Sequence, residues 1–199
     1  MPKAAVKPTS AGPVYQIKVT LEDLEPAIWR RLLVPADITL EKLHRVLQVA
    51  MGWEDEHLHH FMVGKVIYDS PHPYADTFGD PDTESAVTAR LCEVLPRVKA
   101  KMDYEYDFGD GWLHRIEVEK IVEQPVEEQV PSCLAGANAC PPEDCGGPPG
   151  YVDLLEALRD PEHPEHESMF DWIGEEFDPV HFDVAAVNRA LKPKARRAR

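Results

Sequence analysis

The run Asp107-Phe108-Gly109-Asp110-Gly111-Trp112-Leu113-His114 places two carboxylates, an indole and an imidazole close together in the chain. Carboxylate oxygens and an imidazole nitrogen are donors that suit a divalent metal ion. In the alternative interpretation, Asp110 shapes a turn and Asp107 accepts hydrogen bonds from the nearby backbone. The residue types therefore predict either a cation site or a polar turn here.

A second dense segment, from Cys133 to Gly150, carries three of the four cysteines. The spacing of Cys133, Cys140 and Cys145 lacks the Cys-x-x-Cys pair typical of zinc sites, so the cysteines are either ligands for zinc or another divalent metal, or buried thiols. The pair Glu143-Asp144 is either a catalytic acid pair or a pair of acceptors for backbone N–H groups.

Three histidines cluster before and within a predicted strand. Alternation along a strand sends His60 to the opposite face from His57 and His59, so these two are metal candidates only if a third ligand joins them. The tryptophans are expected to be core residues or groove walls rather than stacking platforms. They are Trp29, Trp53, Trp112 and Trp172.

Apolar periodicity predicts the elements that must position these groups. Alternating patterns indicate strands over residues 14–21, 28–34, 58–63 and 66–68. A helix is expected from Thr39, a good N-cap, to Gly52, a typical stop. Its apolar face comprises Leu40, Leu43, Val46, Leu47, Ala50 and Met51.

Residues 101–122 alternate again and predict a hairpin, in which Asp110-Gly111 is expected to form a tight two-residue turn. Residues 70–85 and 124–150 are predicted to be long loops, and helices are expected over 151–159, 165–173 and 184–191, the last capped by Asp183. Arg30 and Arg31 must point to opposite faces of their strand, and the inward guanidinium is expected to pair with a carboxylate.

The chain of 199 residues, 43% of them hydrophobic, is long enough for one good core. We expect an α+β fold in which a twisted, mainly antiparallel sheet packs on one main helix, with C-terminal helices and a Cys/Pro/Gly-rich loop closing one end. The predicted organisation is a disordered leader (1–13), a single domain (14–191) and a basic disordered tail (192–199). The sequence contains neither an apolar run of about 18 residues nor a signal-peptide core, which favours a cytoplasmic protein.

The formal net charge is −15, from 21 basic and 36 acidic residues. Five of the basic residues lie between Lys192 and Arg199, and without them 16 basic residues face 36 acidic ones, a net charge of −20. Such a body should repel nucleic acid, so weak, nonspecific binding by the tail is all that we expect. A protein or a small ligand is the predicted partner, and no membrane interaction is expected.

Several motifs together resemble the plasmid pRiA open-reading-frame-three-like family. They are Trp29-Arg30-Arg31, Leu43 to Gln48 with Met51-Gly52-Trp53, His57-Leu58, Tyr104 to Asp110, Cys140 to Gly147, and Gly150-Tyr151. The resemblance implies a small α+β domain of unknown biochemistry, sometimes labelled a resolvase or a mobile-element protein. A serine recombinase needs a nucleophilic serine and a basic DNA-reading helix, and this chain offers neither, so we reject that chemistry.

The sequence leaves two functional hypotheses. The first is a binding or interaction module without catalysis, associated with a plasmid or transposon. The second is a metal-dependent hydrolase that uses the Asp107/Asp110/His114 and Glu143/Asp144 clusters. We also predict that the two dense segments meet in space, and a separation well beyond about 15 Å between the Cα atoms of Asp110 and Asp144 would contradict a single site. The predicted groove residues are Trp53, His57, Tyr106, Asp107, Asp110, Trp112, His114, Glu143 and Asp144.

Overall fold

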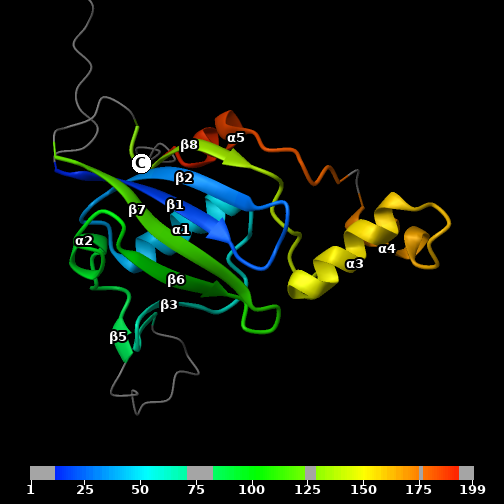
Figure 1. Ribbon diagram of the computed structural model, residues 1–199, viewed down its shortest axis with the longest axis horizontal. Helices are drawn as coiled ribbons and strands as arrows, with labels where there is room; N and C mark the ends of the chain where they lie inside the picture. The colour runs from blue at the N-terminus through cyan, green and yellow to red at the C-terminus, as the bar shows by residue number, and fades with distance from the viewer. Residues whose placement is uncertain (1–11, 71–82, 124–128, 175–176, 193–199) are drawn as a thin grey trace, which may run out of the picture.

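The computed structural model describes residues 12–70, 83–123, 129–174 and 177–192. These residues form one eight-stranded sheet and five helices (Figure 1). Across the sheet the strand order is β5-β4-β3-β6-β7-β1-β2-β8, and every neighbouring pair is antiparallel except β4 with β5. The predicted α+β class with a mainly antiparallel sheet is confirmed. The strands are β1 (Val14–Leu21), β2 (Ile28–Pro35), β3 (His59–Val63), β4 (Val66–Asp69), β5 (Thr83–Ser85), β6 (Lys101–Tyr106), β7 (Trp112–Val122) and β8 (Ser132–Ala137).

Helix α1 (Leu40–Met51) covers one face of the sheet, as predicted. The Thr39 hydroxyl caps it by accepting a hydrogen bond from the Lys42 N–H, and Gly52 ends it in the left-handed conformation at φ 102°. The buried positions of α1 pack against the inward residues of the central strands in one hydrophobic core. In Figure 1 this helix lies behind β1 and β2. The remaining helices are α2 (Leu91–Val94), α3 (Gly147–Arg159), α4 (His166–Ile173) and α5 (Val184–Ala190).

The hairpin of β6 and β7 exists, but the predicted two-residue turn is wrong. Tyr106 pairs with Trp112 at the last rung, so residues 107–111 all lie outside the ladder. Asp107 and Gly111 both adopt positive φ, at 57° and 71°. The longer connection arises because Asp107 leaves the strand to make local hydrogen bonds. Its carboxylate therefore lies where the connecting loop begins, directly after β6.

The predicted long loop over residues 124–150 is also corrected. Within it, β8 pairs with β2 at the edge of the sheet, and α3 begins at Gly147 rather than at Tyr151. Small residues mask the alternation of β8. A Cβ at Gly136 would lie 2.8 Å from the Trp29 carbonyl oxygen and 2.4 Å from the Phe182 ring, so the strand needs glycine here. Prolines in the first turn of α3 are tolerated because N–H groups there have no helical partner.

Several predictions fall on parts of the chain outside the described residues. These are most of the leader, most of the basic tail, and residues 71–82 of the predicted surface loop. Thr83–Ser85, the end of that predicted loop, instead forms the short strand β5. Among the described residues, none of the helices has the length and apolar character needed to span a bilayer.

Candidate functional site

The two dense segments of the sequence meet at one end of the sheet. The backbone N–H of Gly146 donates to Asp110 Oδ2 at 3.1 Å, and a Cβ on Gly147 would lie 2.3 Å from the Asp110 carbonyl oxygen. The loop after β6 and the start of α3 are therefore in direct contact. This contact confirms the predicted meeting of the segments, and it uses the Asp110 carboxylate as a structural link between the two loops.

Asp107 is held by its own loop. Its N–H donates to the Leu58 carbonyl at 2.8 Å, and its Oδ1 accepts from the Gly109 N–H at 2.9 Å and from the Asp110 N–H at 3.4 Å. The second oxygen, Oδ2, lies 3.7 Å from His57 Nδ1. Asp107 is thus a buried carboxylate with one oxygen committed to the turn and the other directed at a histidine.

Glu143 comes from the loop before α3 and is fixed by the segment after α1. Its Oε1 accepts from the Glu54 N–H at 2.9 Å and from the Tyr106 hydroxyl at 3.1 Å. Burial has the largest effect on the pKa of Tyr106 and the nearby Glu143 carboxylate the next largest, and both raise it. The hydroxyl therefore remains a donor. The Trp53 indole N–H donates to the Pro141 carbonyl at 3.0 Å and fixes the same loop.

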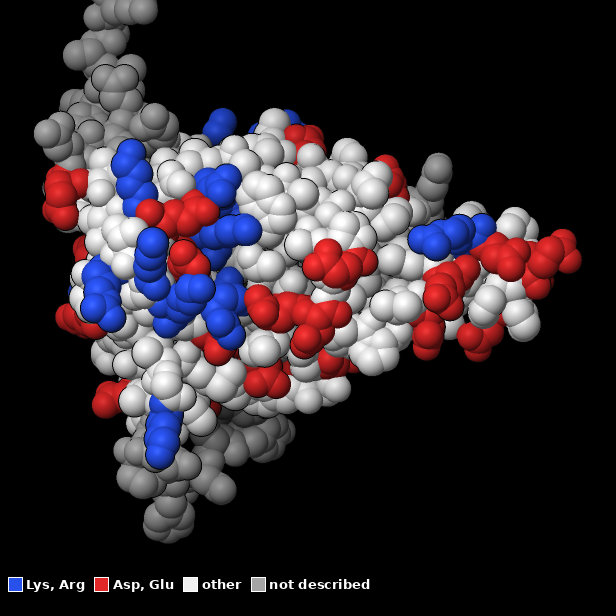
Figure 2. All heavy atoms as spheres, viewed as in Figure 1, with Lys and Arg blue, Asp and Glu red and all other residues white. Residues whose placement is uncertain are grey.

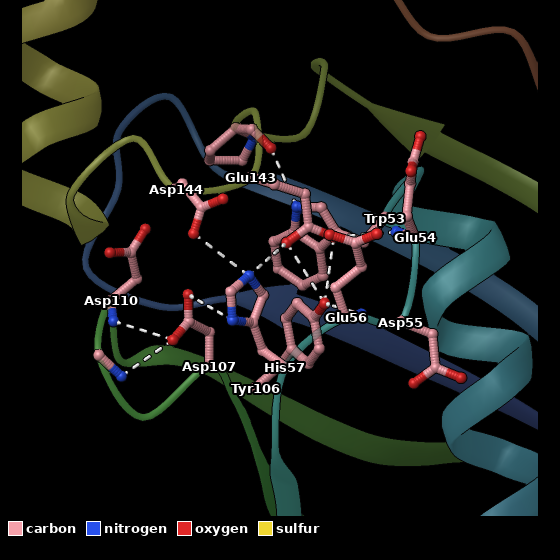
Figure 3. Close-up of polar contacts among 12 residues, drawn as sticks. Trp53, Glu54, Asp55, Glu56, His57, Tyr106, Asp107, Asp110, Glu143 and Asp144 are labelled. Atoms are coloured by element: carbon pink, nitrogen blue, oxygen red, sulfur yellow. Dashed lines mark hydrogen bonds and ion pairs between the residues drawn. The ribbon is translucent and has the colours of Figure 1, made fainter.

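His57 lies among three carboxylates, as Figure 3 shows. Its Nε2 is 3.2 Å from Asp144 Oδ1 and 3.7 Å from Glu143 Oε2, whereas its Nδ1 faces Asp107. Although Nε2 is buried and close to Asp144, it makes no hydrogen bond. We call His57, Asp107, Glu143 and Asp144 the His57 cluster. Its one nitrogen and several carboxylate oxygens match the donors of borderline divalent metals.

A second group, His44, Asp55 and His59, also brings potential metal ligands together. The rings of His44 and His59 stack in parallel, with centroids 3.4 Å apart and planes at 4°. Lone pairs in parallel planes cannot converge on one ion, because each lies in the plane of its own ring. The geometry of this group therefore does not favour a shared metal.

Hydrogen bonds give this second group a different role. Gln48 Nε2 donates to the Tyr104 hydroxyl, which is 2.8 Å from His44 Nδ1, and His44 Nε2 is 2.5 Å from Asp55 Oδ1. Burial lowers the pKa of His44 and brings that of His59 to about 4. These linked hydrogen-bonding contacts orient the neutral His44 ring, and Asp55 connects it to the loop that carries His57. Sequence reasoning missed this chain, although His44 shares the apolar face of α1.

The structure places the other predicted groove residues differently. Trp53 and Tyr106 stack at 4.8 Å and form a wall beside the His57 cluster, while Trp112 lies behind them in the core. His114 does not line the cluster, because it is fully buried and its ring contacts those of Trp53 and Tyr104. Its place on β7 follows the alternation that puts Ile116 and Val118 in the core.

The three candidate cysteine ligands do not form a metal site among the described residues. All are free thiols, and burial raises the pKa of Cys133, of Cys140 and, to about 12, of Cys145. Raised pKa values disfavour the thiolate that a metal needs. The cysteines instead pack in or against the hydrophobic core.

The expected carboxylate partner for the inward arginine is also wrong. Arg30 points inward as predicted, but it donates to the carbonyls of Ala50, Trp29 and Ala137, each at 2.9 Å, and lies over the Phe182 ring at 3.8 Å. Ala50 lies at the C-terminal end of α1, where carbonyl oxygens carry partial negative charge, so this acceptor can replace a carboxylate. It is Arg31, on the outer face of the sheet, that forms an ion pair with a carboxylate, that of Glu119.

The fold and the site define a small α+β protein in which two loops bring carboxylates around one histidine. The chain belongs to the plasmid pRiA4b ORF-3-like family, whose model matches residues 13–186. It is 37% identical over 179 residues to the uncharacterized protein y4hQ of Sinorhizobium fredii (strain NBRC 101917 / NGR234), covering 89% of this chain and 90% of that protein. A crystal structure of MM3350, a protein of unknown function from Methanosarcina mazei Go1, matches with a TM-score of 0.78 and 34% identity over 88% of this chain and 98% of that one.

Proposed function

We propose that the protein is a binding module that holds a divalent metal ion in the His57 cluster. The observation that carries the proposal is the buried His57 Nε2, which faces two carboxylates without a hydrogen bond. In this arrangement His57 Nε2 and Asp144 supply ligands, and the donor atoms of His57, Asp107 and Asp144 all lie within 4.8 Å of one another. Glu143 Oε2, which accepts from the Tyr106 hydroxyl at 3.3 Å, lies 3.7 Å from the same nitrogen. A bound cation would also relieve the repulsion among three carboxylates held around one imidazole.

Asp107 has a supporting role in this proposal. Metal-binding histidines almost always donate their other ring N–H to a carboxylate, a carbonyl or water. Asp107 Oδ2 faces Nδ1 of His57, so it is placed to accept that bond and to present Nε2 to the ion. Because Asp107 and Asp144 belong to different loops, an ion held at His57 would tie the hairpin to the segment before α3.

Thermal unfolding of the full chain tests the proposal. After chelation, Mn²⁺ or Zn²⁺ at about 100 times its Kd should stabilise the chain by about 2.7 kcal/mol, which is a rise of about 5 to 10 °C in Tm. Asp144→Asn should abolish this rise, whereas Asp171→Asn, an exposed change on α4, should retain it. An equal rise in both variants, or none in the unaltered chain, contradicts the proposal.

The exposure of Asp144 favours metal-dependent hydrolysis as a second candidate. Its side chain is 69% exposed, so an ion bound there would keep positions open for water. Three protein ligands and an open position are typical of catalytic metals, which lower the pKa of bound water. Metal-dependent turnover of a model phosphodiester or ester that Asp144→Asn abolishes would support this candidate, and a rate equal to that of the metal alone would exclude it for these substrates.

We also propose the setting in which such a module would act. The family description supports a plasmid or other mobile element, and the net charge of −15 supports a protein or small-molecule partner rather than nucleic acid. A cytoplasmic location belongs to the same proposal. Fractionation of the native host, with detection by a specific antibody, tests the location.

A further inference from the structure

A groove between α3 and α4 lies beside the His57 cluster. It is an open pocket of about 420 Å³, within the size range of small-ligand sites, and Asp144 lines it as well as belonging to the cluster. Its other relevant lining residues are Asp153, Leu154, Glu165, Met169 and Trp172. On the face in view, Figure 2 shows acidic side chains gathered at the α3–α4 end of the molecule, whereas most Lys and Arg lie over the sheet.

The groove combines unpaired negative charge with an apolar surface. Asp153 and Glu165 make no ion pair within the described part of the chain, and no Lys or Arg lines the cavity. Of its apolar lining residues, Leu154 is buried, Met169 is partly buried, and Trp172 is 49% exposed. An exposed indole can attract a cation through its ring face. Carboxylates next to aliphatic and aromatic carbon suit a ligand that is both cationic and apolar.

A metal ion does not fit the groove itself. Neither Asp153 nor Glu165 belongs to any group of described side chains that could converge on one ion. The carboxylates instead share the pocket lining with apolar side chains. This distribution matches a ligand whose positive charges are separated by methylene groups.

We propose that the groove binds a small aliphatic amine with two or more ammonium groups. The ammonium groups contact Asp144, Asp153 and Glu165, and the methylene segments cover Leu154, Met169 and the Trp172 ring. The inference goes beyond metal binding and does not depend on it. Because Asp144 also belongs to the His57 cluster, an ion bound there would neutralise one groove carboxylate and weaken amine binding.

Calorimetric titration of the full chain with spermidine, in chelator, tests the proposal without any metal. We expect saturable binding of spermidine and none of 1,8-octanediol, an uncharged chain with a similar apolar body. Asp153→Asn and Glu165→Gln should each weaken binding about fivefold, as for a partly exposed charge pair. Glu156→Gln, which removes a charge on α3 outside the groove lining, is the matched control and should bind as the unaltered chain does.

Several outcomes would overturn the assignment. They are absence of saturable binding, equal weakening by Glu156→Gln, and tighter binding of a lysine-containing peptide, which would make the groove a peptide site. Failure of the metal proposal is distinguishable, since it would leave spermidine binding in chelator unchanged. Added Mn²⁺ that weakens spermidine binding in the unaltered chain, but not in Asp144→Asn, would show that the two sites share Asp144.

Discussion

Asp107 shows how one side chain can both build a loop and prepare a ligand. One carboxylate oxygen accepts two backbone N–H groups of its own loop, and the other faces the ring of His57. Asparagine also tolerates positive φ, and its amide oxygen can keep the loop contacts while the negative charge is lost. The substitution therefore separates the two roles.

We predict that Asp107→Asn lowers the affinity of the His57 cluster for Mn²⁺ or Zn²⁺ by about 10- to 100-fold, as observed for outer carboxylates in metal sites. The free energy of unfolding without metal should change by less than about 1 kcal/mol. Titration calorimetry and urea unfolding of the same protein measure both quantities. Unchanged metal affinity would show that Asp107 serves the loop alone.

His114 links stability to pH. Burial lowers its pKa to about 4 in the folded chain, against about 6.5 when unfolded. Between these values the unfolded state binds a proton that the folded state excludes. Stability is therefore lost as the pH falls from about 6.5 to 4, by roughly 3 kcal/mol for this residue.

The prediction is that His114→Phe makes the free energy of unfolding less dependent on pH between 4 and 6.5. Urea unfolding at several pH values measures the slope, which stays informative even if the variant is less stable overall. His59, whose pKa is also lowered to about 4, should leave part of the slope in place. An identical slope in the variant and the unaltered chain would mean that His114 accepts a proton when folded.

At the scale of elements, Arg30 joins parts of the chain that are distant in sequence. It belongs to β2, and its guanidinium reaches the end of α1, the end of β8 and the Phe182 ring. Alternation along the strand predicted that one arginine must be buried. It could not predict the acceptors, because the carbonyls of Ala50 and Ala137 become neighbours only when α1 and β8 pack against β2.

We expect Arg30→Met to lower the free energy of unfolding by about 3 kcal/mol, since it leaves buried carbonyl groups without their donor. Arg31→Met is the matched control on the same strand. It breaks a partly exposed pair with Glu119 and should cost no more than about 1 kcal/mol. Urea unfolding compares them, and equal losses would show that the inward contacts of Arg30 add nothing.

Local patterns in the sequence predicted β1 and α1 with their observed bounds, because alternation and the Thr39 and Gly52 caps act within a few residues. They failed for β8, whose small residues show no alternation, and for the turn at Asp107, where side-chain hydrogen bonds lengthen the connection. The site shares this limit. The concentration of polar residues and glycines in two segments predicted both loops, and His57 was among the predicted groove residues. Only tertiary packing distinguishes His57, which lies in the cluster, from His114, which is buried in the core.

At the scale of the whole molecule, charge is distributed unequally between the body and the C-terminus. The body is strongly acidic, whereas five cations lie between Lys192 and Arg199, most of them beyond the described residues. Counterion release alone would drive binding of such a segment to DNA, so the affinity should fall steeply with salt. We predict that truncation after Leu191 removes any binding to duplex DNA, measured at two salt concentrations. Sequence-selective binding by the truncated chain would contradict this view.

We propose that the two loops meet to hold one metal ion through His57. Titration calorimetry of the chelator-treated full chain with Mn²⁺ and Zn²⁺ tests it most directly, with His57→Gln as the variant. His60→Gln is the control, because His60 also lies beside a carboxylate, at 3.2 Å from Glu105, but outside the cluster. We expect saturable binding of one ion per chain in the unaltered protein and the control, and none in His57→Gln. Binding that survives His57→Gln unchanged, or no saturable binding in the unaltered chain, would contradict it.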